Sequence, residues 1–162
     1  MISKNINSSI IFHVTRLSES VKQHGELITN QYGITTQQWV IMLLLAKDPN
    51  ILYIQENPDK KYLVAKDIAD ALHVSRANVT NLLAILIDKK LIKHIALKGD
   101  NRLKPLQLTT KGLKIIANLE TPRYIRNAAL FKNYSDAEKQ LFINFMDAAL
   151  QIMKDDFKKL SL

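Results

Sequence analysis

A run of seven residues, Ser75 to Asn81, combines side chains that can bind the base edges and the backbone of a nucleic acid. It holds one guanidinium, two carboxamides and two hydroxyl groups. Arginine pairs with guanine edges, asparagine with adenine edges, and serine or threonine with bases or phosphates. A small residue at position 77 leaves room for close approach. The candidate contacts to double-stranded DNA are Ser75, Arg76, Ala77, Asn78, Thr80 and Asn81.

A second basic group follows in the turn Lys98-Gly99-Asp100-Asn101-Arg102, and Lys104 lies just beyond it. Glycine, aspartate and asparagine favour a tight turn, so this segment is predicted to form the tip of a β-hairpin. Lys98, Arg102 and Lys104 can then contact phosphates or a minor groove. Asp100 lies two residues before Arg102, and we expect it to orient that guanidinium or to brace the hairpin. The alternative is an ordinary solvated turn.

The positive charge of the chain is concentrated in the segment that holds both groups. Of a formal net charge of +8, residues 60–112 carry +7, from eleven Lys and Arg against four Asp. The remaining residues carry +1, from twelve basic and eleven acidic side chains. A clustered excess of this kind is the electrostatic footprint of a nucleic-acid site, whereas a scattered excess bears only on solubility.

Apolar periodicity predicts the helix that positions the first group. Between Ser75 and Lys89 the apolar residues follow an i, i+3, i+4, i+7, i+8 pattern: Val79, Leu82, Leu83, Leu86 and Ile87. The candidate contacts lie on the opposite side, with Ser75 as N-cap. On an isolated helix such a face is more often merely solvated. Here a shorter helix with apolar residues at Ile68, Ala69 and Leu72 precedes it, and the turn His73-Val74-Ser75 has helix-turn-helix length.

Two strands are predicted around the basic turn, at Leu91–Leu97 and Leu103–Leu108. The order of helix, turn, helix and hairpin is that of a winged helix-turn-helix. The predicted fold class is therefore mainly α with a small β-hairpin wing (α+β), flanked by N- and C-terminal dimerisation helices. Three parts are expected: N-terminal helices over 1–47, a DNA-binding lobe over 48–112, and C-terminal helices over 113–162.

The flanking segments predict helices with apolar stripes. Residues Asn5–Gln31 show coiled-coil-like spacing of Ile10, Val14, Leu17, Val21, His24 and Ile28. Thr35 and Gln38 predict a capping box for a helix that ends near Lys47. Ser135 and Glu138 predict another, for a last helix with a stripe at Phe142, Phe145, Met146, Ala149, Leu150, Met153 and Phe157.

Prolines interrupt the segments between these helices. Asp48–Tyr62 is polar and contains two prolines, which predicts a loop, with a short strand at Ile51–Ile54 as one possibility. A helix is expected from Gly112 to about Glu120, where Pro122 must start, kink or interrupt it.

The terminal stripes can pack on each other, on the basic module or on a second subunit. A two-fold homodimer suits a palindromic operator, and a monomeric bundle is the alternative.

Composition narrows the class of protein. A chain of 162 residues without cysteine is long enough for a core and has no disulfide or thiolate zinc site. No apolar run approaches the roughly 20 residues that span a bilayer, and no signal peptide is evident at the start. We therefore expect a cytoplasmic protein that does not bind a membrane. The motifs of nucleotide-binding, hydrolase and zinc-protease sites are missing, so no enzyme activity is predicted.

Five segments in order resemble the MarR family of bacterial transcriptional regulators. They are Gly33–Trp39, Asp67–Leu72, Val74–Leu82, Asp100–Arg102 and Leu108–Gly112. The first is similar to the opening of the family's second helix, and the next two are similar to the first helix of its helix-turn-helix and to its recognition helix. The fourth is similar to the D-x-R signature of its wing, and the last to the L-T-x-x-G entry to its fifth helix. The resemblance implies a homodimer with interlocking terminal helices, and ligand-tuned repression or activation through a pocket between the dimer helices and the DNA-binding lobe.

The sequence departs from the family pattern at three places. Lys90 stands where the family usually has glycine, and a left-handed conformation there would cost roughly 1 kcal/mol. Asn81 stands where a basic residue is common, which predicts a weaker DNA contact at that position. The loop Asp48–Tyr62 is longer than expected and can offer an added strand or a partner surface.

The position of an effector site is less well specified. His13, Arg16 and Trp39 can line a small-molecule pocket, with Arg16 able to pair with a carboxylate. Core packing is the favoured interpretation for Trp39. A metal site at His13, His24 and Glu26, as in zinc-sensing relatives, lacks a paired histidine after Gly112, so we predict no metal and no cofactor.

Two hypotheses follow. The first is a dimeric, sequence-specific DNA-binding regulator, such as a repressor, with the helix at 75–89 in the major groove and the wing at 98–104 on the backbone or minor groove. The alternative is a winged-helix module that uses the same surface, or the long loop, to bind a protein.

Overall fold

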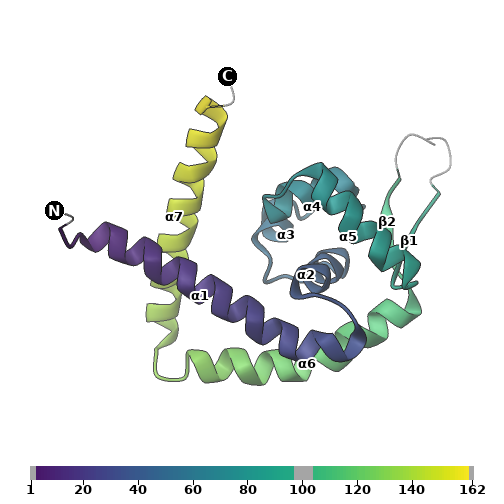
Figure 1. Cartoon of the computed structure of the whole chain (residues 1–162), viewed down its shortest axis with the longest axis horizontal. Coiled ribbons are helices and arrows are strands. Elements are labelled where there is room, and N and C mark those ends of the chain that lie inside the picture. The colour runs from purple at the N-terminus through teal and green to yellow at the C-terminus, as the bar shows by residue number, and fades with distance from the viewer. Residues whose placement is uncertain (1–2, 97–103, 161–162) are drawn as a thin grey trace. The chain divides into compact units, whose positions relative to one another are not determined.

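The structure, a computed structural model, describes residues 3–96 and 104–160. The first helices are α1 (Ile6–Thr29), α2 (Thr36–Leu45), α3 (Leu52–Glu56), α4 (Ala65–Leu72) and α5 (Arg76–Asp88), with a short 3-10 helix η1 (Asn30–Tyr32) after α1. Strands β1 (Ile92–His94) and β2 (Leu106–Leu108) follow, and then helices α6 (Thr110–Leu130) and α7 (Asp136–Leu160) (Figure 1). The prediction of a mainly helical chain with a small β-hairpin is confirmed.

The chain divides into two compact units, Met1–Thr121 and Pro122–Leu162. The first unit contains the hydrophobic core, in which α2 packs against α1, α5 and β2. Since α2 is apolar almost all round, it can only be stable inside a core. The largest fully buried side chains come mainly from α2, α4, α5 and the start of the hairpin: Ile34, Ile41, Met42, Leu44, Ile68, Val79, Leu86, Leu91 and Ile92.

The hairpin has a short paired stem. β1 pairs with β2 antiparallel, with Ile92 opposite Leu108 and His94 opposite Leu106. Leu63 adds an antiparallel bridge to Leu106, and the amide of Leu106 donates to its carbonyl at 2.9 Å. The strands are shorter than the predicted Leu91–Leu97 and Leu103–Leu108, and residues 97–103 lie outside the described part of the chain.

Three helices end in the same way, with a left-handed residue that is not glycine. Lys47, His73 and Lys90 have φ of 58°, 52° and 57° after α2, α4 and α5. In α5, the amide of Lys90 donates to the carbonyl of Ile87 at 2.8 Å and that of Leu91 to Leu86 at 2.9 Å. This pair of bonds defines a Schellman motif, which usually takes glycine at the left-handed position. Lys90 is therefore left-handed, so the condition under which its side chain carries a strain cost is met.

The possible strand at Ile51–Ile54 is wrong, because this segment forms the short helix α3. The carboxylate of Asp48 accepts hydrogen bonds from the backbone and side-chain nitrogens of Asn50, at 2.9 and 2.8 Å. Such a turn reverses the chain locally. The amide of Gln55 then donates to the carbonyl of Ile51, so one helical turn follows directly.

The helix after the hairpin is also longer than predicted. It begins at Thr110 rather than after Gly112, because the hydroxyl of Thr109 accepts a hydrogen bond from the amide of Gly112 at 3.1 Å and caps the helix. It continues through Pro122 to Leu130, beyond the expected end near Glu120. The boundary between the two compact units falls at this proline.

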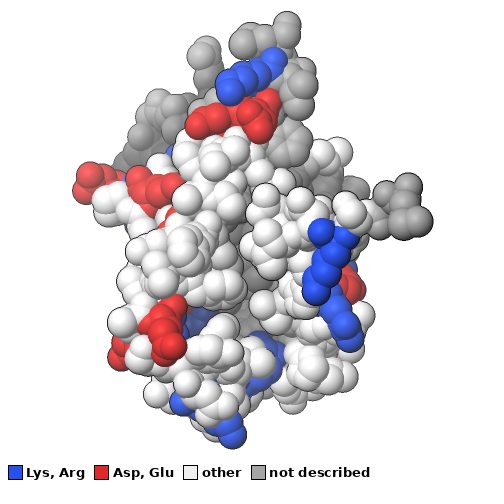
Figure 2. Space-filling model, turned by 90° about the vertical axis from the view of Figure 1, so that its left-hand side faces the viewer, with Lys and Arg blue, Asp and Glu red and all other residues white. Residues whose placement is uncertain are grey.

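The N-terminal half of α1 is not covered within its own unit. The buried residues of α1 are Gly25 and Thr29, near its C-terminal end. Large apolar side chains before them are exposed, among them Ile6, Ile10, Phe12, Val14, Leu17 and Val21. Figure 2 shows that most of the described side chains visible from this side are uncharged.

In the second unit, α7 begins with the predicted capping box. The amide of Ser135 donates to the Glu138 carboxylate at 2.8 Å, and the amide of Glu138 donates to the Ser135 hydroxyl at 3.3 Å. The first of these bonds lowers the pKa of Glu138. Apolar side chains of the predicted stripe are exposed: Phe142, Phe145, Met146, Leu150 and Met153. Among the described residues, no helix has the length and apolar character to cross a membrane.

Candidate nucleic-acid interface

Helix α5 buries one side and exposes the other, as its sequence predicts. Val79, Leu83 and Leu86 are buried, and α4 and α2 pack against this helix. The candidate contacts on α5 and at its N-cap are all exposed: Ser75, Arg76, Ala77, Asn78, Thr80 and Asn81. The structure thus brings these six residues together on one exposed surface at the start of the helix.

Hydrogen bonds stabilise the first turn of α5. They also determine whether the hydroxyl groups of Ser75 and Thr80 remain available to DNA as donors or as acceptors. Ser75 is the N-cap, and its hydroxyl accepts from the amide of Asn78 at 3.2 Å. Its own proton can still be donated. The hydroxyl of Thr80 donates to the carbonyl of Arg76 at 2.8 Å, so this side chain is left as an acceptor. An acceptor suits the amino group of adenine or cytosine rather than a phosphate.

The N-terminus of α5 favours an anionic partner. The first turn contains no acidic residue, and Arg76 is the first residue of the helix. Amide groups at a helix N-terminus carry partial positive charge and are oriented toward an approaching phosphate. An arginine beside them adds a full positive charge. This surface can therefore bind a phosphate and a base edge together.

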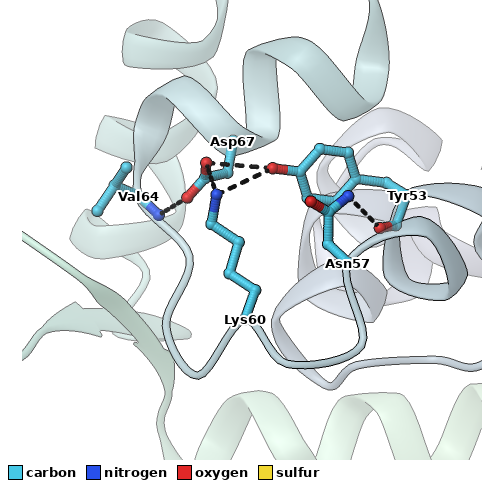
Figure 3. A network of polar contacts seen from close by, with 5 residues as sticks. All are labelled: Tyr53, Asn57, Lys60, Val64 and Asp67. Carbon is cyan, nitrogen blue, oxygen red and sulfur yellow. Dashed lines mark hydrogen bonds and ion pairs between the residues drawn. The ribbon is translucent and has the colours of Figure 1, made fainter.

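The preceding helix α4 is held by a buried carboxylate (Figure 3). Asp67 is 5% exposed and accepts from the amide of Val64 at 2.8 Å, which anchors the N-terminus of the helix. The hydroxyl of Tyr53, in α3, donates to the same carboxylate at 3.1 Å, and Lys60 forms an ion pair with it. The long loop before α4 thus binds directly to the first helix of the helix-turn-helix.

Hydrogen bonding and burial shift the pKa values of two residues of this cluster. The hydrogen bond to Asp67 raises the pKa of Lys60 above its usual value. Burial raises the pKa of Tyr53, and the hydrogen bond from Lys60 partly opposes that shift. The ammonium group of Lys60 also lies 5.9 Å from the centre of the Tyr53 ring. Lysine and tyrosine therefore both keep their protons at neutral pH and support the carboxylate.

This cluster was not predicted from the sequence. Its contacts connect residues seven and fourteen positions apart through an irregular loop. The available signal was the acidic Asp67 in the first turn of a predicted helix, where a carboxylate can accept from the amide of the residue before the helix.

The wing is only partly described. Lys104 is exposed just before β2, on the side of the hairpin tip. The predicted contacts Lys98, Asp100 and Arg102 lie outside the described residues. On the paired stem, Lys93 lies opposite Gln107 and is exposed. The described part of the wing therefore exposes two basic side chains, those of Lys93 and Lys104.

The candidate effector residues lie in different environments. His13 and Arg16 are exposed on α1, and the Nδ1 atom of His13 lies 2.7 Å from the carbonyl oxygen of Ser9. Trp39 is 4% exposed in the core, the favoured interpretation of its sequence. Its indole nitrogen and the hydroxyl of Thr29 are both buried and have no hydrogen-bond partner among the described residues. Within one chain, the three residues therefore do not form a common exposed surface.

Comparison with known proteins gives a consistent result. The sequence pattern of the MarR family matches residues 32–103. The S. aureus MepR–DNA complex is 26% identical with a TM-score of 0.70, covering 90% of this chain and 95% of that one. NadR in complex with 4-hydroxyphenylacetate is 27% identical with a TM-score of 0.70, covering 93% and 97%. The uncharacterized HTH-type transcriptional regulator YsmB of Bacillus subtilis (strain 168) is 24% identical over 124 residues, 75% of each chain.

The family match spans the helix-turn-helix and its surroundings, and the structural similarity extends over nearly the whole chain. The family match and the structural similarity both agree with the described structure, in which α5 exposes a polar face, buries the opposite face and is followed by the stem of a hairpin. The chain is similar to the MarR family of winged helix-turn-helix transcriptional regulators, in sequence over residues 32–103 and in fold over nearly its whole length.

Proposed function

We propose that this protein is a homodimeric, sequence-specific DNA-binding regulator that inserts α5 into the major groove of a palindromic operator. The observation that carries the proposal is the exposed surface of Ser75–Asn81, with Arg76 at the start of the helix. The wing at 98–104 is assigned to the backbone or the minor groove. Because the MarR family consists of transcriptional regulators, the prediction that the chain is not an enzyme is confirmed.

A dimer is proposed from the uncovered apolar residues. The N-terminal half of α1 exposes a row of large aliphatic side chains, and α7 exposes its own stripe. Contiguous apolar surface of this kind marks a protein interface. The three-part organisation follows, with residues 1–47 and 113–162 in dimerisation and 48–112 in DNA binding. A regulator of bacterial DNA acts in the cytoplasm, which is the proposed location.

A small-molecule effector is the second part of the proposal. NadR is described in complex with 4-hydroxyphenylacetate, an aromatic carboxylate, and Arg16 can pair with such a group. His13 and Trp39 complete the candidate ligand residues, provided that dimer formation brings them to one pocket.

The proposal is tested by a gel shift with the DNA that flanks the gene, with scrambled DNA of the same composition as control. We expect a shift that unlabelled flanking DNA removes and scrambled DNA does not. A stable dimer that shifts neither DNA would contradict the proposal and favour the alternative, a winged-helix module that binds a protein partner.

A further inference from the structure

The end of α5 is bound directly by the start of α6. Three consecutive carbonyl groups follow the last turn of α5, those of Lys89, Lys90 and Leu91. The Lys111 ammonium donates to the first at 3.0 Å and the Thr109 hydroxyl donates to the second at 2.7 Å. The amide of Thr109 donates to the third at 3.0 Å. All of these residues belong to the first compact unit.

The first of these contacts satisfies the carbonyl of Lys89, the C-cap of α5, and the other two satisfy the carbonyls of the two residues that directly follow it. The last carbonyls of a helix have no intrahelical donor and normally bind water or a capping group. Here α6 supplies the donors, from Thr109 and Lys111. The same threonine hydroxyl accepts from the amide of Gly112 at 3.1 Å, so one side chain both caps α6 and binds the end of α5.

Gly112 allows the two elements to approach closely. A Cβ atom at this position would overlap the carbonyl oxygen of Leu91 and lie 3.0 Å from Cδ2 of Leu108. The backbone of Leu91 cannot move away easily, because its amide is bound to Leu86 in the Schellman motif. Hydrogen bonds on one side and close packing on the other therefore leave α6 little freedom to tilt relative to α5.

We propose that Thr109, Lys111 and Gly112 form a joint that fixes the direction of α5 relative to α6, and thereby the spacing of the two half-sites that a dimer can bind. The inference rests on the proposed function. The part of α6 in the first unit, residues 110–121, is about 18 Å long, so a tilt of about 10° at the joint moves its far end by about 3 Å. That displacement is close to the rise of one base pair, about 3.4 Å. In a two-fold dimer it applies to both recognition helices.

The joint is tested by DNA binding of Thr109→Val, which keeps the shape of the side chain and removes the contacts of the hydroxyl with the carbonyls of Lys90 and Leu91 and with the amide of Gly112. The probes are the DNA fragment that the wild-type protein shifts, and the same fragment with one base pair inserted between the half-sites. We expect the wild-type protein to prefer the native spacing by about tenfold or more, as for other single defects in a site. Thr109→Val should retain less than about a third of that preference, with an unchanged salt dependence of binding because the phosphate contacts remain.

Two control variants separate the joint from a general loss of stability. Thr109→Ser keeps the hydroxyl and should restore the spacing preference. Thr35→Val removes the threonine cap of α2, whose hydroxyl accepts from Gln38 at 3.2 Å, and should leave the preference unchanged. If Thr109→Val does not fold, Lys111→Met removes one donor from the same joint and takes its place in the test.

The possible failures are distinguishable. A wild-type protein that binds no DNA specifically overturns the proposed function. A wild-type protein that binds its fragment but accepts the inserted base pair equally well overturns the joint alone. The same conclusion follows if folded Thr109→Val discriminates between the two fragments as strongly as the wild-type protein.

Discussion

At the scale of single residues, Lys90 is in a conformation that its side chain disfavours. Its φ of 57° lies in the left-handed region, at the position of a Schellman motif where glycine is preferred. A left-handed backbone costs a non-glycine residue about 1–2 kcal/mol. Replacement by glycine removes this strain, but glycine also loses more conformational entropy on folding, which offsets about 0.5–1 kcal/mol of the stabilisation.

Lys90→Gly should therefore stabilise the folded protein by about 0.5–1 kcal/mol, which denaturant unfolding can measure. The neighbouring Lys89→Gly serves as control, because Lys89 has φ of −70° and gains nothing from glycine. A destabilised Lys90→Gly variant would show that the lysine side chain contributes more than its backbone strain costs.

Lys60 is the second residue whose contribution to the stability of the fold can be measured. Lys60→Met leaves the buried carboxylate of Asp67 without its ion-pair partner and should destabilise the fold by about 1–2 kcal/mol, reduced from the value for a fully buried pair because Lys60 is partly exposed. Lys61→Met, at the exposed neighbouring position, should have little effect.

The effect of Lys60 has a defined pH dependence. Its pKa is raised in the folded state, so its stabilising contribution is complete below its usual pKa of 10.5 and is lost as pH rises through the higher folded value. The difference in unfolding free energy between wild type and Lys60→Met should be constant over neutral pH and shrink above 10.5. A difference that shrinks already near neutral pH would contradict the assigned ion pair.

At the scale of elements, the predictions succeeded where the determining contacts are local. The capping boxes Thr35–Gln38 and Ser135–Glu138 and the N-cap Ser75 were all confirmed, because cap and partner lie three residues apart. Period and length likewise predicted α1, α5 and α7. The DNA-contact roles of the exposed residues on α5 stay predictions.

Sequence reasoning failed where an element depends on residues far apart or on an unusual backbone. The left-handed ends at Lys47 and His73 carry no glycine, which is the usual signal of a Schellman motif. Helix α3 is half-buried against the core, and its apolar residues have no period long enough to distinguish a helical turn from a strand. The continuation of α6 through Pro122 opposes the usual rule for proline.

Helix α5 gives a prediction at this scale. Arg76→Ala should weaken binding to the specific DNA by about 1–3 kcal/mol and reduce the salt dependence if the guanidinium contacts a phosphate. Fluorescence anisotropy at several salt concentrations measures both quantities. Lys114→Ala removes one exposed positive charge from α6 and should change affinity much less. Equal losses for the two variants would mean that total charge, rather than α5, determines binding.

For the whole molecule, binding of a palindromic operator requires a dimer. The double substitution Val14→Glu/Leu17→Glu places charges on the exposed apolar row of α1 and should yield monomers in sedimentation experiments, with a loss of specific DNA binding. Thr15→Glu/Ser18→Glu adds the same charge at exposed polar positions of the same helix and should remain dimeric. A dimer that survives the first pair of substitutions would remove α1 from the proposed interface.

The central claim is that this chain reads DNA sequence through α5. The most direct test is selection of bound sequences from random double-stranded DNA with the wild-type protein and with Arg76→Ala. We expect the wild-type protein to enrich a palindrome with half-sites about one helical turn apart, and Arg76→Ala to lose the preference at one base position in each half. An absence of any enriched sequence, or the same palindrome selected equally well by both proteins, would contradict the claim.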